Sequence, residues 1–367
     1  MRTISFPSIR YLFSLGILMA LFLGSTFAHA AWQQEWERVL KAAKQEGKVA
    51  VLGPTGTHRG DALTLPFQKK FGIRVEYRGE RGSGAPPLIG AQQRADYYAW
   101  DIFVGGTTTG LTSLIPMGAL QTMDPFLILP EVKNPENWRG GSLEFVDPGH
   151  QMLVMSPSQR ATIFVNKNMV KPGEIKSYKD LLDPKWKGKM VADDPRTPGP
   201  GQATFAFFYM HPDLGPEFIR ALVRQNLLII KNYRQEIDFI GQGKYPILLG
   251  TSDSTADARM KQGLPIRILD PRELKEGSDI SPAAGNVAVF TRVPHPNAAR
   301  VYLNWLLSKE GQTIFVQAAG YISARLDVPT DHSPWRIPIP GAIKTYDQAA
   351  MDKKGEIVRF LRKVLRR

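Results

Sequence analysis

The sequence predicts an α/β fold in which mostly parallel sheets carry helices on their faces. Short apolar segments alternate with segments of helical periodicity in the order strand, loop, helix, strand, and this order is typical of parallel sheets. Of the 367 residues, 43% are hydrophobic, and a chain of this length can build the cores of two domains of ordinary size. No internal repeat or low-complexity linker interrupts the pattern.

The first half of the chain predicts three helices and three strands. Helices are expected at residues 32–43, 62–71 and 88–95, and strands at residues 48–52, 73–77 and 100–104. Gly47 and Gly72 follow the first two helices and end them. Pro66 cannot donate a backbone hydrogen bond, so we expect it to limit the second helix on one side or the other.

The second half continues the same alternation. Strands are expected at residues 161–166, 189–192, 247–249 and 287–290, and helices at residues 178–182, 203–210, 216–225 and 296–307. Pro296 suits the first turn of the last helix, where its missing N–H costs nothing. A loop rich in proline and glycine, residues 195–201, leads into the apolar helix at 203–210.

The C-terminus predicts an amphipathic helix. Its apolar face holds Ile357, Phe360, Leu361, Val364 and Leu365, and basic residues surround that face. A basic helix of this kind can lie on a membrane surface. Docking on the protein's own domain is the simpler interpretation, since most such stripes are core contacts.

The first 30 residues have the three parts of a secretory signal peptide. Arg2 and Arg10 give a positive start, residues 11–23 form an apolar stretch, and Ala28–Ala30 is a small-x-small cleavage site. The mature chain is therefore expected to begin at Ala31. An apolar stretch of about 13 residues is too short for a membrane anchor, which needs about 20.

Net charge and the absence of cysteine narrow the function. The formal net charge is +13, and removing residues 1–30, which hold two arginines and no acidic residue, leaves +11. Outside the cytoplasm a positive net charge favours anionic solutes over nucleic acid as ligands. A generally basic surface without an anion-binding cleft would give the same net charge. With no cysteine, disulfides, thiolate metal sites, cysteine nucleophiles and a lipid anchor at the cleavage site are excluded. A soluble periplasmic protein fits best.

Five segments resemble ABC-transporter substrate-binding proteins of the ferric-iron-binding type. They are residues 36–52 (WERVLKAAKQEGKVAVL), 71–75 (FGIRV), 100–104 (WDIFV), 178–190 (YKDLLDPKWKGKM) and 296–312 (PNAARVYLNWLLSKEGQ). The fourth segment is the most specific. Together they span most of the mature chain in the right order, but because they are structural they say little about the ligand.

This resemblance implies a two-lobed periplasmic binding protein of type II, each lobe a mostly parallel sheet flanked by helices, with the ligand cleft between the lobes. Lobe 1 is expected over residues 31–160 and lobe 2 over residues 161–285, and residues 286–367 return to lobe 1 with the C-terminal helices. The family's lobes close on the solute. The closed form, a monomer without a cofactor, docks on the permease of an ABC transporter at the inner membrane.

The ligand is expected beyond the carboxyl ends of the strands. Loops there offer helix N-termini, small hydroxyl side chains and two arginines, which suit a small anion gripped from both lobes. The candidate ligand-binding residues are Thr55, Thr57, His58, Arg59, Ser83, Gly84, Gly106, Thr107, Thr108, Arg196, Thr197, Gly199, Thr251 and Ser252. Each loop alone is equally explained by turn chemistry. Arg59 and Arg196 also suit surface salt bridges, and Asp253 is expected to cap a helix.

Iron can be considered directly. The resemblance implies two adjacent tyrosines, often with a histidine and a carboxylate, but Gly250–Ser252 stand where the tyrosine pair is expected and Gly105–Gly106 stand at the carboxylate position. Tyr97–Tyr98 precede a buried strand, at the end away from the cleft. His58 alone remains, so we predict no metal site. A ferric-ion-binding protein of an iron importer stays the alternative.

An enzyme is the alternative of another class. Asp193 and Asp194 are adjacent acids, but neighbours on an extended segment point opposite ways. Ser252 and Asp253 lack a nearby histidine, and no G-x-S-x-G, HExxH or Walker A motif occurs. A secreted hydrolase is therefore the second hypothesis. The predicted function is the periplasmic solute-binding component of an ABC importer, which captures a small anionic solute and delivers it to a membrane permease.

Overall fold

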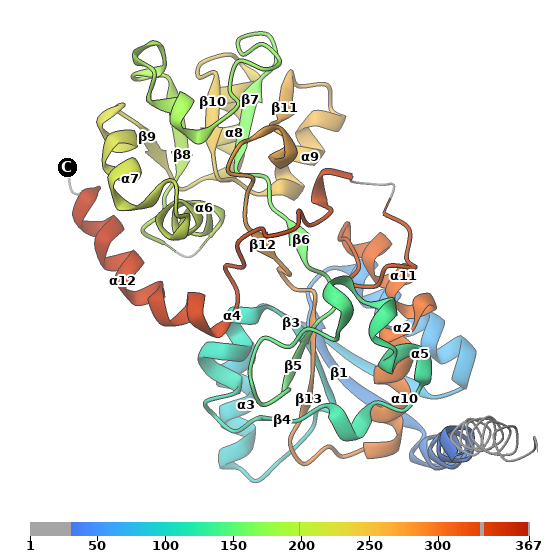
Figure 1. The fold of residues 1–367 in the computed structure, drawn as a ribbon. Helices are drawn as coiled ribbons and strands as arrows, with labels where there is room; N and C mark the ends of the chain where they lie inside the picture. Colours follow the sequence, from blue (N-terminus) through green and yellow to red (C-terminus); the bar gives the residue numbers. More distant parts are fainter. Residues whose placement is uncertain (1–30, 198, 331–333, 366–367) are drawn as a thin grey trace, which may run out of the picture.

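The computed structural model describes residues 31–197, 199–330 and 334–365; the predicted signal peptide, residues 1–30, lies outside them. Two sheets, each covered by its own helices, form two lobes (Figure 1). The α/β, two-lobed architecture predicted from the sequence is confirmed. Within the described ranges, none of the helices combines the length and the apolarity that crossing a membrane requires.

Lobe 1 is built on a six-stranded sheet of order β2-β1-β3-β13-β4, with β5 beside β13. The strands are β1 (Lys48–Pro54), β2 (Arg74–Glu80), β3 (Ile102–Gly105), β4 (Leu120–Gln121), β5 (Met152–Val154) and β13 (Asn286–Phe290). β1 runs parallel to β2 and β3, so their carboxyl ends meet at one edge. β13 is antiparallel to β3 and comes from late in the chain, so two distant chain segments form this sheet.

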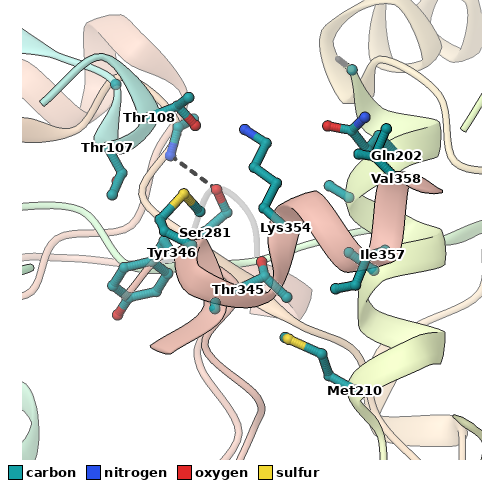
Figure 2. Close-up of a pocket in the computed structure, with 17 residues that line it drawn as sticks. Thr107, Thr108, Gln202, Met210, Ser281, Thr345, Tyr346, Lys354, Ile357 and Val358 are labelled. Atoms are coloured by element: carbon teal, nitrogen blue, oxygen red, sulfur yellow. Dashed lines mark hydrogen bonds between the residues drawn. The ribbon is translucent and has the colours of Figure 1, made fainter. Parts of the chain in front are cut away.

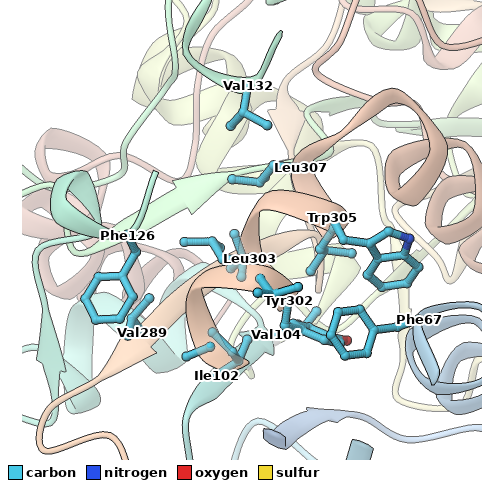
Figure 3. Packing of buried hydrophobic residues seen from close by; sticks show 14 of the residues in the cluster. Phe67, Ile102, Val104, Phe126, Val132, Val289, Tyr302, Leu303, Trp305 and Leu307 are labelled. Atoms are coloured by element: carbon cyan, nitrogen blue, oxygen red, sulfur yellow. The ribbon is translucent and has the colours of Figure 1, made fainter. Parts of the chain in front are cut away.

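Helices from both parts of the chain cover this sheet. They are the N-terminal helix (residues 31–46), α2 (Thr57–Phe71), α3 (Ala85–Arg94), α4 (Thr107–Thr109), α5 (Pro130–Lys133), α10 (Pro296–Leu307) and α11 (Lys309–Ala319). In the core, Phe67 of α2 packs against Tyr302 and Trp305 of α10, with ring centroids 5.0 and 5.4 Å apart (Figure 3). This aromatic cluster joins the first and last segments of the lobe.

Helix α2 runs through Pro66, which the sequence analysis expected to limit it. A proline inside a helix costs about 3 kcal/mol, because it removes a hydrogen bond and crowds the preceding turn. Leu63 and Phe67, on either side of it, are completely buried. Burying side chains of this size contributes about 1.5–3 kcal/mol each, so packing against the core outweighs the local preference.

Lobe 2 is built on a five-stranded sheet of order β11-β7-β10-β8-β9. Its strands are β7 (Ile163–Asn166), β8 (Met190–Asp193), β9 (Leu228–Ile230), β10 (Ile247–Leu249) and β11 (Ile266–Ile268). Its helices are α6 (Pro200–Met210), α7 (Gly215–Arg224), α8 (Tyr233–Gly241) and α9 (Asp253–Lys261). β8 and β10 are parallel and buried along their whole length, which explains why both are apolar except for Asp193 at the carboxyl end of β8.

Two short strands, β6 (Ser158–Gln159) and β12 (Ile280–Ser281), pair antiparallel between the lobes. Side chains reinforce this crossing. Gln159 donates from Nε2 to the carbonyl of Ser278 at 2.7 Å, and its Oε1 accepts from the N–H of Ile339 at 3.1 Å. The C-terminal part of the chain is therefore fastened to the crossing strands.

A buried ion pair lies beside these strands. The guanidinium of Arg160 contacts the carboxylate of Asp279, with Nη1 and Oδ2 3.2 Å apart, and donates to the carbonyl of Pro200 at 3.1 Å. Thr345 donates its hydroxyl hydrogen to the same carboxylate at 2.7 Å. Arg160 thus connects the crossing strands to the start of α6.

The C-terminal helix α12 (Gln348–Val364) extends from one lobe to the other (Figure 1). Tyr346, just before it, packs into the core of lobe 1 and donates to Glu144 at 2.6 Å. Ile357 and Leu361 pack into the core of lobe 2. The predicted stripe is therefore docked on the protein, and it contacts both lobes, whereas the sequence analysis assigned residues 286–367 to lobe 1.

Candidate functional site

Loops at the carboxyl ends of β2 and β3 meet at one edge of lobe 1. The buried side chain of Asn286 donates to the carbonyl of Gly105 at 2.9 Å and to the hydroxyl of Thr107 at 3.2 Å. Thr109 donates its hydroxyl hydrogen to the carbonyl of Gly82 at 3.2 Å. These bonds tie the loop after β2 to the start of α4 and hold the edge in place.

In lobe 2, the carboxyl end of β8 leads into the N-terminus of α6. The carboxylate of Asp193 accepts from the N–H of Gly201 at 2.7 Å. A Cβ atom on Gly201 would lie 2.3 Å from the carbonyl oxygen of Asp193, so the close approach of strand and helix requires glycine. The strand's own carboxylate therefore compensates much of the positive end of this helix.

A cavity of about 330 Å³ lies between the two lobes, and α12 forms one of its walls (Figure 2). Lobe 1 contributes Gly106–Thr108, and helix α6 of lobe 2 contributes Gln202 and Met210. Helix α12 contributes Met351 and Lys354. A volume of this order lies within the range of small-molecule sites.

The wall of the cavity combines polar and apolar groups. Figure 2 shows the head of Lys354 pointing into the space between Thr108 and Gln202, with Met210 and Ile357 at the opposite side. Among the described residues that line the cavity, Lys354 carries the one charged side chain. The arrangement suits a small solute that has a negative group and an apolar part.

Four of the predicted ligand-binding residues line this cavity. They are Gly106, Thr107, Thr108 and Gly199. The first three follow β3, and Gly199 precedes α6, so residues predicted from strand ends in both lobes line the same cavity. Their contact with a solute stays a prediction.

The other predicted residues of lobe 1 lie along the same edge but outside the cavity lining. Thr55, Thr57 and His58 are exposed at the start of α2, and the guanidinium of Arg59 lies 5.6 Å from the ring centroid of Tyr321. Ser83 and Gly84 precede α3. The ligand role of all six stays a prediction.

The two predicted ligand-binding residues after β10, Thr251 and Ser252, lie outside the cavity lining and differ from each other in burial. Thr251 is 1% exposed and donates its hydroxyl hydrogen to Glu236 at 2.8 Å. Burial raises the pKa of Glu236 to about 8, and the charge of nearby Asp193 adds to this effect. Glu236 therefore holds a proton at neutral pH. Thr251 faces the interior of lobe 2, whereas Ser252 is half-buried at the start of α9, where Asp253 is the first residue.

Arg196 is engaged within lobe 2. Its guanidinium donates two hydrogen bonds of 2.8 Å to the carboxylate of Asp194, from Nε to Oδ1 and from Nη2 to Oδ2. Thr197 donates to the carbonyl of Asp194 at 3.2 Å. Burial acts to raise the pKa of Asp194, but the bonds from Arg196 outweigh it and hold this pKa below its usual value. The geometry favours the salt-bridge alternative for Arg196.

Replacing Arg196 with alanine is therefore expected to lower the free energy of unfolding by about 1 kcal/mol, because the pair is partly exposed to solvent. Solute affinity is expected to stay unchanged. Arg196→Lys, which keeps the charge but loses the two-point geometry, should fall between wild type and alanine. Denaturant unfolding and calorimetric binding measure the two quantities, and a weakened affinity at unchanged stability would restore Arg196 as a ligand residue.

Residues 62–339, more than half of the chain, match the family of bacterial extracellular solute-binding proteins. The chain belongs to this family. The resemblance to ABC-transporter substrate-binding proteins is thereby confirmed, and the main function follows: this solute-binding protein is the solute-binding component of an ABC transporter. Families of this kind typically bind and release without catalysis, and they act outside the cytoplasm.

Solved structures share the fold of this solute-binding protein at low identity. A Trichodesmium protein named IdiA or FutA, in complex with iron and citrate, is 20% identical with a TM-score of 0.66. The periplasmic binding protein AfuA of Actinobacillus pleuropneumoniae, with fructose-6-phosphate bound, is 16% identical with a TM-score of 0.60. An ABC transporter structure from Clostridium perfringens is 14% identical with a TM-score of 0.69. Each match covers 87% of this chain and 99%, 98% and 100% of the other chain, respectively.

The positions relevant to iron differ from the tyrosine pattern. After β10, Gly250 has a φ of 61°, and a Cβ atom there would lie 2.8 Å from the hydroxyl of Thr204, so a tyrosine would not fit. Tyr97 and Tyr98 precede β3, away from the cavity, with the guanidinium of Arg292 4.8 Å from the ring centroid of Tyr98. Within the described residues, no cluster of three or more His, Asp or Glu could hold a metal ion.

Sequence reasoning missed the contribution of α12 to the cavity. Met351, Lys354 and Val358 line it, and their spacing of three and four residues places them on one helix face. The apolar residues at 357–365 had identified an amphipathic helix. Following the same helix face back toward Gln348 shows Lys354 among apolar neighbours. A lysine on an apolar helix face is the sequence signal that indicates a role for α12 in the site.

Proposed function

We propose that this solute-binding protein captures a small anionic solute in the cavity between its lobes. The lining carries the proposal: its one charged side chain among the described residues is the ammonium of Lys354, and its other polar groups are hydroxyls and amides. A cavity of about 330 Å³ suits a metabolite-sized molecule rather than a polymer. The net charge of +11 that remains without residues 1–30 adds a general attraction for anions.

Closure of the lobes supplies the mechanism. A solute in the cavity touches α4 of lobe 1 and α6 of lobe 2 together only while the lobes are close. Because binding shifts a conformational equilibrium by the difference in affinity between its states, such contacts stabilise the closed form. The short ladder of β6 and β12 and its flanking segments are the natural hinge.

The remaining functional assignments belong to the same proposal. The mature chain begins at Ala31, is soluble in the periplasm, works as a monomer, and presents its closed form to a membrane permease. The lobe boundaries at residues 160 and 285, each shortly after one of the crossing strands β6 and β12, are part of the same proposal. Intact-mass analysis of the exported protein tests the first point, and a mass that retains residues 1–30 would contradict it.

The experiment begins with the solute that co-purifies with the protein. Mass spectrometry after denaturation identifies it, and refolded protein is then screened by thermal shift against phosphorylated sugars, phosphonates, dicarboxylates and tricarboxylates. Uncharged sugars, cationic cofactors and ferric citrate serve as comparison probes. We expect a one-to-one stabilisation by a member of the anionic group, without turnover.

Three results would contradict this function. Stabilisation by uncharged or cationic probes alone would remove the anion assignment. A visible tyrosinate-to-iron absorption band with ferric citrate would restore the iron alternative. Turnover of an added ester or phosphate would support the hydrolase hypothesis instead.

A further inference from the structure

The ammonium of Lys354 is the unexplained group of the cavity. The side chain is half-buried on α12, and within the described residues no hydrogen bond or ion pair engages it. Burial lowers the pKa of this ammonium, and no carboxylate contributes an opposing effect. Removing a charge from water without a partner costs free energy, so an anion beside Lys354 would offset the cost of burying this ammonium.

Apolar side chains line the cavity around this ammonium. Met210 and Ala206 come from α6, and Met351, Ile357 and Val358 come from the same helix as Lys354. Methionine side chains adapt their shape to an apolar ligand. A solute that is charged throughout, such as a tricarboxylate, would leave this surface without a partner.

We propose that Lys354 binds the anionic head of a solute whose body is apolar, so that α12 forms part of the binding site. This inference rests on the proposed function and narrows its ligand class to a carboxylate or phosphate attached to a short hydrocarbon part. The polar groups of Thr108 and Gln202 lie on the side toward which Lys354 points (Figure 2). They complete a site for the head, while Met210 and Ile357 receive the body.

Helix α12 lies outside the part of the chain that matches the family. The match to the solute-binding family ends at residue 339, so α12, at Gln348–Val364, lies outside it. Tyr209 of lobe 2 donates to Glu356 of α12 at 2.5 Å, and Tyr346 fixes the start of the helix to lobe 1. Contacts with both lobes, just before the helix and at its middle, therefore present Lys354 at a defined place.

Calorimetric titration with four probes of equal chain length tests the inference: octanoate, octyl phosphate, 1-octanol and octylamine. Wild-type protein is expected to bind octanoate or octyl phosphate more tightly than octanol, and octylamine least. The tighter of the two anions identifies the head group. Lys354→Met should weaken anion binding roughly 10- to 100-fold, the loss of one charge-assisted hydrogen bond, and leave octanol binding unchanged.

Lys353→Met is the matched control, because Lys353 is exposed on the same helix, and it should bind all probes like the wild type. Ala206→Trp fills the cavity and should abolish binding of every probe. Equal anion affinity in Lys354→Met and wild type would overturn the role of Lys354, as would octylamine binding as tightly as octanoate. If the co-purified anion binds and only these amphiphiles fail, the proposed function stands and this inference is wrong.

Discussion

Replacing Asp279 with alanine is expected to lower the free energy of unfolding by about 3–5 kcal/mol. Asp279 is completely buried, and its partner Arg160 is 13% exposed in its side chain. Removing one member of a buried ion pair leaves the other charge without compensation, and losses of this order follow. Burial acts to lower the pKa of the Arg160 guanidinium. The negative charges of Asp279 and, to a smaller extent, Asp253 have the opposite effect, and together they raise this pKa.

Denaturant unfolding of Asp279→Ala measures this loss. Glu217→Ala is the control, because Glu217 pairs with Arg220 on the surface and its loss should cost less than about 1 kcal/mol. The double variant Arg160→Met/Asp279→Leu removes both charges and should recover much of the stability. Equal losses in Asp279→Ala and Glu217→Ala would show that the pair contributes nothing beyond a surface contact.

The regular elements could be predicted because their causes are local. The strand β10 and the first three residues of β8 are short apolar runs, and α10 starts at Pro296, as expected. Helix α2 departs from the prediction at Pro66, because the burial of Leu63 and Phe67 depends on α10, which lies far away in sequence. Strands β6 and β12 have two residues each, too few for any periodicity, so the crossing between the lobes was known only through the family resemblance.

The candidate site could be predicted in part. Gly106–Thr108 and Gly199 were found because strand ends in parallel sheets converge on ligands. Thr251 satisfies the same rule, but its hydroxyl faces the buried carboxyl of Glu236, which local sequence does not reveal. Arg196 stands two residues after the acid that it binds. The local spacing places Lys354 on the apolar face of α12, but it reaches the cavity only because α12 contacts both lobes, and that long-range arrangement cannot be read from local sequence.

Glu236→Gln is expected to remove a pH-dependent loss of stability. The pKa of Glu236 rises from 4.5 to about 8 on folding, because the side chain is buried. Between these values the folded protein holds a proton that the unfolded chain has released, so the free energy of unfolding falls as pH rises. The slope is at most about 1.4 kcal/mol per pH unit, which amounts to roughly 3–5 kcal/mol over the window.

Glutamine reproduces the protonated acid without titrating. Its Oε1 can accept from Thr251, as Glu236 does at 2.8 Å, and its amide N–H can donate toward the Asp193 carboxylate that faces it. The variant and wild type should therefore be similarly stable near pH 4.5, and the variant should be several kcal/mol more stable near pH 8.

Unfolding curves measured at half-unit steps from pH 4.5 to 8.5 give the difference between the two proteins. Glu37→Gln, at an exposed position, controls for the loss of one surface carboxyl and should follow wild type at every pH. A constant difference between Glu236→Gln and wild type across the range would mean that Glu236 is ionised throughout. The hydrogen bond from Thr251 would then be charge-assisted, and substitution would cost stability equally at all pH values.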